Sequence, residues 1–115
     1  MRKFLALCFL LAFCVGSLAE IRPGAEMQVK ANSIWFEDAA QLKKWQRRKK
    51  SGDAKAFAAY QDRLIRRRDA WQFVNPLTVK ILGYDRRRSQ VKVEMTTEGR
   101  FRGSTWFLDA AAIEQ

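Results

Sequence analysis

The stretch that decides the fold is Leu77–Ile113, LTVKILGYDRRRSQVKVEMTTEGRFRGSTWFLDAAAI. Apolar residues alternate with polar ones around Val79 and again around Val93, which is the period of strands with one buried face. The polar segment Asp85–Ser89 has the composition of a hairpin turn, and a glycine-flanked turn leads to a third strand that carries Trp106. Short consecutive strands joined by tight turns predict a small antiparallel barrel.

Upstream of this stretch the period changes to that of helices. Asp38 begins a capping-box pattern, and Gly52 followed by Asp53 can end one helix and cap the next. The apolar residues at helical spacing are Leu42, Trp45, Phe57, Tyr60, Leu64 and Ile65. The sequence therefore predicts a two-helix hairpin over about residues 38–69.

The first 19 residues have the pattern of a secretory signal peptide. Arg2 and Lys3 precede an apolar run that is shorter than the roughly 20 residues of a membrane-spanning helix. Small residues follow near Ala19, so we expect cleavage of residues 1–19; the alternative is a buried first helix. The mature chain would then have no transmembrane helix and would be exported to the periplasm or secreted. Residues 20–25 are expected to form a flexible lead-in to a single domain over 26–115.

Both cysteines, Cys8 and Cys14, lie in the predicted signal peptide, so the mature chain would have no disulfide and no thiol nucleophile. Lipid attachment at Cys14 is disfavoured because lipoprotein signals have a small residue before the cysteine, whereas Phe13 is large. The chain has no histidine, which removes serine–histidine catalysis and the usual zinc sites. We therefore predict a protein that is not an enzyme and uses no metal and no cofactor.

The chain is strongly basic. It has 22 Lys and Arg residues against 12 Asp and Glu residues, and loss of Arg2 and Lys3 would leave 20 against 12, a net charge of +8. Such an excess favours anionic polymers or lipid headgroups, whereas nucleic acid is disfavoured because export separates the protein from it. The alternative is a solvated surface that keeps a small domain soluble. The candidate anion-binding residues are Arg66, Arg67, Arg86, Arg87 and Arg88.

Three segments resemble the bacterial Src-homology-3-like (SH3-like) barrel domains of exported proteins. Val29–Trp35 is similar to their opening strand and loop, Pro76–Leu82 to the strand after the long loop, and Gly103–Phe107 with Ala112–Ile113 to the strands that close the barrel. Relatives also carry helices in the first long loop. The chain lacks the usual asparagine-valine-arginine after the first strand. The resemblance implies a mainly β fold, an SH3-like barrel of about five strands with an inserted helical hairpin.

The resemblance also implies a non-catalytic binding module of the bacterial cell envelope, with peptidoglycan or another envelope protein as its partner. Trp106 corresponds to an aromatic residue near a ligand-facing surface, and Tyr84 and Trp35 would extend that surface. The alternative for Trp106 is packing in the core. A second hypothesis is a basic module held to anionic polymers or lipid headgroups by charge. A third is a structural protein whose helical hairpin docks on a partner.

Overall fold

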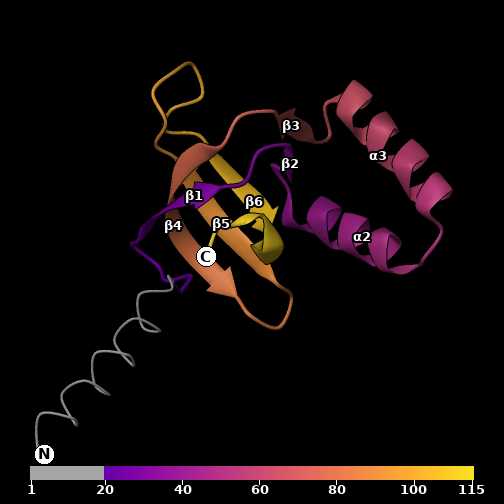
Figure 1. The fold of residues 1–115 in the computed structure, drawn as a ribbon, viewed down its shortest axis with the longest axis horizontal. Helices are drawn as coiled ribbons and strands as arrows, with labels where there is room; N and C mark the ends of the chain where they lie inside the picture. Colours follow the sequence, from indigo (N-terminus) through magenta and orange to yellow (C-terminus); the bar gives the residue numbers. More distant parts are fainter. Residues whose placement is uncertain (1–19) are drawn as a thin grey trace, which may run out of the picture.

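The computed structural model describes residues 20–115. Its centre is an antiparallel sheet with strand order β1-β4-β5-β6 (Figure 1). The four strands are β1 (Glu26–Val29), β4 (Leu77–Asp85), β5 (Gln90–Met95) and β6 (Thr105–Asp109). Strands β4, β5 and β6 pair in chain order as two successive hairpins. The strands predicted from the alternation are confirmed.

The alternating apolar residues of this sheet fill one core. Val79 lies opposite Met95, and Ile81 lies opposite Val93, so their side chains meet on the same face. The register shifts between Ile81 and Gly83, and such a bulge increases the local bend of a strand. The sheet therefore curves around its apolar face. The buried residues of this first core are Ile21, Met27, Val29, Trp35, Val79, Ile81, Val91, Val93, Met95, Trp106, Leu108 and Ile113.

A second, two-stranded antiparallel sheet is formed by β2 (Ser33–Trp35) and β3 (Trp71–Phe73). The helical hairpin separates these two strands in sequence and brings them together in space. A single bridge joins Phe36, just after β2, to Phe107 of β6. The two-stranded sheet is thereby attached to β6, at the edge of the larger sheet.

The end of the described chain returns to its beginning. The 3₁₀ helix η1 (Ala110–Ala112) directly follows β6. Ile113 then forms a bridge with Val29, and the Lys30 N–H donates to the Ala112 carbonyl at 2.8 Å. A mainly antiparallel β domain with two helices is thus confirmed. The predicted barrel is not closed by continuous ladders, because single bridges join these edges.

The predicted helical hairpin is present as α2 (Ala39–Lys50) and α3 (Ala54–Arg67). The Asp38 side chain accepts from the Ala40 N–H, and the Asp53 side chain accepts from the Ala56 N–H, each at 3.0 Å. These bonds satisfy amide groups that a helix start leaves unpaired. Gly52 has φ +91° in the turn between the helices, a conformation that suits glycine.

The helices enclose a second core beside the first. In Figure 1 they form a V next to the sheet, with α2 running along the edge where β6 lies. Phe107 packs against this cluster from β6, so both faces of that strand are covered. The buried residues of the second core are Ile34, Phe36, Leu42, Trp45, Tyr60, Leu64 and Ala70.

Segment 20–25 is not the flexible lead-in that the sequence predicts. Ile21 is only 4% exposed and belongs to the first core. The Gly24 N–H also donates to the Ile81 carbonyl at 2.7 Å, and the Ala25 carbonyl accepts from the Ile81 N–H at 2.8 Å. The segment extends the pairing of β1 with β4 and is held in place by it.

The predicted signal peptide, residues 1–19, with Cys8 and Cys14, lies outside the described residues. Among residues 20–115, no helix is both long enough and apolar enough to cross a bilayer.

Candidate anion-binding site

A cleft of about 420 Å³ lies between helix α2 and the turn that joins β4 to β5. We refer to it as the basic cleft, because six cationic side chains and a single carboxylate, that of Asp109, line it. The cations come from two segments that are about 40 residues apart in the chain, so only the fold brings them together. The residues that line the basic cleft are Lys43, Gln46, Arg47, Lys49, Lys50, Arg87, Arg88, Ser89 and Asp109.

Helix α2 contributes one stripe of side chains to the basic cleft. Lys43, Gln46, Arg47 and Lys50 are spaced i, i+3, i+4 and i+7, and residues with this spacing lie on the same face of a helix. The buried Leu42 and Trp45 face the second core instead. Consecutive basic residues of α2 are therefore divided between faces, and this stripe lines the basic cleft.

The β4–β5 turn holds the other cations. The Ser89 N–H donates to the Arg86 carbonyl at 3.3 Å, and Ser89 has φ +52°. The Arg88 N–H donates to Asp85 Oδ1 at 3.3 Å. These bonds close a tight turn with Arg87 and Arg88 at its tip, where both side chains are exposed.

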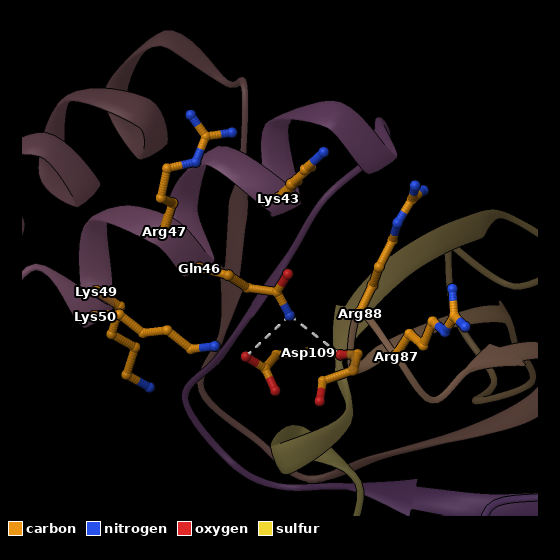
Figure 2. A pocket seen from close by; sticks show the side chains of 9 residues that line it. Lys43, Gln46, Arg47, Lys49, Lys50, Arg87, Arg88 and Asp109 are labelled. Atoms are coloured by element: carbon orange, nitrogen blue, oxygen red, sulfur yellow. Dashed lines mark hydrogen bonds between the residues drawn. The ribbon is translucent and has the colours of Figure 1, made fainter.

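A network of amide groups forms the base of the basic cleft (Figure 2). Gln46 Nε2 donates to the Ser89 carbonyl at 3.1 Å and to Asp109 Oδ2 at 3.3 Å. Gln46 Oε1 accepts from Nε2 of the buried Gln90 at 3.3 Å. One side chain of α2 thus contacts the turn, β5 and the end of β6. This network fixes the distance between the two groups of cations.

Most of these cations have no acidic partner. Within residues 20–115, Lys43, Arg47, Lys49, Lys50 and Arg87 form no ion pair. Arg88 Nε lies 3.9 Å from Asp85 Oδ2, between side chains that are both well exposed, so this pair is weak. Mutual repulsion among these charges is reduced when an anion lies between them. The electrostatics of the cleft therefore favour an anionic ligand.

The cationic groups surround the basic cleft and do not converge on one point. Figure 2 shows Lys43 and Arg47 on the helix side and Arg87 and Arg88 on the turn side, with Gln46 between them. A single small anion cannot contact all of these groups at once. An extended ligand with several negative charges can.

The structure places two of the three predicted ligand-binding aromatics in the core. Trp35 is 1% exposed and Trp106 is 2% exposed. Their rings pack edge to face with centroids 5.9 Å apart, and Trp106 Nε1 donates to Ser104 Oγ at 2.7 Å. The prediction that they present a stacking surface is corrected, because neither ring offers a face to a ligand. For Trp106, the alternative of core packing holds.

Tyr84 is half-buried and packs against the first core from β4. It lines a separate open hollow with Lys92 and Phe107, and the Arg86 guanidinium lies over its ring, 5.7 Å from the centroid. The three predicted aromatic residues therefore do not share one surface. Arg86 does not line the basic cleft, although Arg87 and Arg88 do.

Arg66 and Arg67 stand at the end of α3 and do not line the basic cleft. Arg66 Nη2 pairs with Asp62 Oδ2 at 2.8 Å across one turn of the helix, with both side chains exposed. Of the five predicted anion-binding arginines, only Arg87 and Arg88 are brought together with further cations.

The residues predicted to bind anions do not include Lys43, Gln46, Arg47 and Lys50, although all four line the basic cleft. Their i, i+3, i+4, i+7 spacing was available in the sequence as a signal. Basic residues cover most of α2, however, so the pattern alone does not show which face lies against another element.

Comparisons with protein families, with curated proteins and with solved structures found no match to this chain.

Proposed function

We propose that this protein is an exported, non-catalytic module of the bacterial cell envelope that binds anionic polymers or lipid headgroups through the basic cleft. The observation that carries the proposal is that two groups of cations, from α2 and from the β4–β5 turn, line one cleft together with a single carboxylate. Binding of these cations would release counterions condensed on the polyanion, which is a main driving force for polyanion binding.

An SH3-like barrel is the architecture that we propose for the module. The pairing of β4, β5 and β6 in chain order supports it, as does the return of Ile113 to β1 after η1. In this interpretation the long first loop of the barrel contains the two-stranded β2–β3 sheet and both helices. The basic cleft would then lie where the inserted hairpin meets the barrel.

Several features favour binding over catalysis. The chain contains no histidine, and Asp109, the carboxylate in the cleft, already accepts from the Gln46 amide and from the Ala111 N–H. Those bonds hold the carboxylate in place, where it links α2 to the end of β6. A partner recognised by aromatic stacking on Trp106 or Trp35 is less favoured, because both rings are buried.

The test compares two triple variants with the same change in net charge. Arg47→Gln, Lys50→Gln and Arg87→Gln together remove cations of the basic cleft. Lys55→Gln, Arg66→Gln and Arg67→Gln together remove exposed cations outside it. Binding of each to soluble polyphosphate and to phosphatidylglycerol vesicles is measured over a series of salt concentrations.

We expect wild-type affinity to fall steeply as salt rises. The cleft variant should lower the slope of log K against log salt by roughly two to three, since each phosphate contact contributes about 0.7–0.9. The control variant should keep the wild-type slope. Binding that is insensitive to salt, or equal losses in the two variants, would contradict the proposal. Phosphatidylcholine vesicles control for adsorption, and the two anionic probes distinguish a polymer from a membrane surface.

A further inference from the structure

A second cleft, of about 290 Å³, adjoins the basic cleft on the other side of Lys49. Both clefts are lined by Lys49 and Asp109, so they are neighbours with a shared wall. The volume of the second cleft is close to the lower end of the range for ligand pockets, about 300–1,000 Å³. Its lining residues are Lys30, Ala31, Asn32, Ser33, Ile34, Trp45, Lys49, Phe57, Gln61, Asp109, Ala111 and Ala112.

The chemistry of the second cleft differs from that of the first. Its charged groups are Lys30 and the two shared residues, whereas Phe57, Trp45 and Ile34 supply apolar and aromatic surface. Phe57 is the most accessible of these three and packs on Trp45, with ring centroids 5.6 Å apart. The second cleft therefore suits a ligand part with an apolar face and little charge.

A fixed amide group lies beside this aromatic surface. Gln61 Oε1 accepts from Trp45 Nε1 at 2.9 Å, which orients the side chain and leaves its two Nε2 donors for a ligand. Ala31, Asn32 and Ser33 also line the cleft. An aromatic ring next to amide and backbone polar groups can contact both the apolar face and the hydroxyl groups of a sugar.

Lys49 connects the two clefts. Its Nζ lies 5.0 Å from the centroid of the Trp45 ring, a cation–π contact that holds the ammonium group at the shared wall. A chain that passes from one cleft to the other must contact this group. A linear ligand with acidic groups on one unit and an apolar ring face on the next fits this arrangement.

We propose that the two clefts form one groove for an acidic oligosaccharide. Its carboxylate or phosphate groups contact the cations of the basic cleft, and an adjoining sugar ring packs on Phe57 with its hydroxyl groups bonded to Gln61. This inference rests on the proposed function and adds the class of polymer. A polyphosphate chain has no apolar face, so it would use the basic cleft alone.

The test uses two probes, an oligogalacturonate and a polyphosphate of equal net charge, with wild-type protein, Gln61→Ala and Phe57→Ala. Loss of one or two hydrogen bonds should weaken oligogalacturonate binding by roughly three- to tenfold in Gln61→Ala. Polyphosphate binding should stay within about twofold of wild type, because these residues lie outside the basic cleft. Gln28→Ala, which changes an exposed glutamine on β1, is the matched control and should alter neither affinity.

Phe57 also packs against the second core, so its replacement by alanine can disturb the fold. A second measurement therefore uses only the wild-type protein. In wild-type protein, the NMR signal of the Gln61 side-chain amide, which lines only the second cleft, should shift with oligogalacturonate and not with polyphosphate. Polyphosphate binding without oligogalacturonate binding, or equal shifts with both probes, would overturn the inference while the proposed function stands. If neither probe binds the wild-type protein, both the further inference and the proposed function would be overturned.

Discussion

The hydroxyl of Tyr60 is a buried polar group between the two helices. The side chain is 5% exposed, and within residues 20–115 its oxygen has no hydrogen-bond partner. Leaving a buried donor unpaired costs about 1–3 kcal/mol. Tyr60→Phe removes this group and keeps the ring, over which the Arg48 guanidinium lies at 4.7 Å. We therefore expect the free energy of unfolding to stay constant or to rise by about 1 kcal/mol, measured by urea denaturation.

The pH dependence of this variant provides a sharper measurement. Burial raises the pKa of Tyr60 above its ordinary value of 10.0, although Arg48 and Arg63 act in the opposite direction. The folded state holds the tyrosine proton more tightly than the unfolded state does. The free energy of unfolding of the wild type is therefore unaffected by this group below about pH 10 and falls as the pH rises above it. The free energy of unfolding of Tyr60→Phe should therefore exceed that of the wild type by a growing amount as the pH rises above about 10. A variant that is clearly less stable at neutral pH would show that the hydroxyl has a partner.

Trp106 and Phe107 show how much of the site could be predicted residue by residue. Strand alternation puts Trp106 on the same face as Leu108, and both are buried in the first core. That pattern was visible in the sequence, where core packing was the alternative to the predicted ligand-binding role of Trp106. It could not show that Phe107, on the opposite face, would be covered by the helical hairpin, since that contact depends on where α2 lies.

At the scale of elements, the start of α3 depends on one side chain. Asp53 Oδ1 accepts from the Ala56 N–H at 3.0 Å, and the residue precedes a helix of 14 residues. Asp53→Ala should lower the free energy of unfolding by about 1 kcal/mol. Asp62→Ala is the control, because its exposed pair with Arg66 is worth only about 0.3–0.5 kcal/mol. Chemical denaturation of the two variants gives the comparison, and equal losses would mean that the cap contributes nothing beyond charge.

Local signals explain which elements could be predicted. The helices were readable from Asp38, Gly52 and Asp53, and the strands from residues 77–113, because caps, turns and alternation depend on neighbours in the chain. The pairing of β2 with β3 was not readable, since it joins segments about 38 residues apart on either side of the helices. The contact between α2 and the β4–β5 turn is of the same kind. The basic cleft therefore could not be located from sequence, and of its six cations only Arg87 and Arg88 were predicted as anion-binding residues.

At the scale of the molecule, residues 20–115 form two cores that share β6. Trp106 and Leu108 face the first core, Phe107 faces the second, and the bridge from Phe36 to Phe107 ties the inserted segment to the sheet. The basic cleft lies along this junction, so its geometry depends on the docking of the helical hairpin. At 12 and 14 residues, the two helices have lengths that are marginal for isolated helices in water. We infer that the hairpin folds only against the sheet.

This inference predicts that damage to the first core also unfolds the helices. Ile113 is 1% exposed and forms the bridge to Val29 at the edge opposite the hairpin. Ile113→Ala should lower the free energy of unfolding by about 2–5 kcal/mol. Val74→Ala, at a side chain that is 66% exposed, should change it by less than about 0.5 kcal/mol.

Thermal unfolding of Ile113→Ala, followed by helical circular dichroism and by tryptophan fluorescence, decides whether the two cores are coupled. We expect one transition, with the same lowered midpoint for both signals, because the two cores share β6 and unfold together. A helical signal that persists after the fluorescence transition would show that the hairpin is stable without the sheet. In that case the two groups of cations could separate while both segments remain folded, and the basic cleft would be an adjustable site.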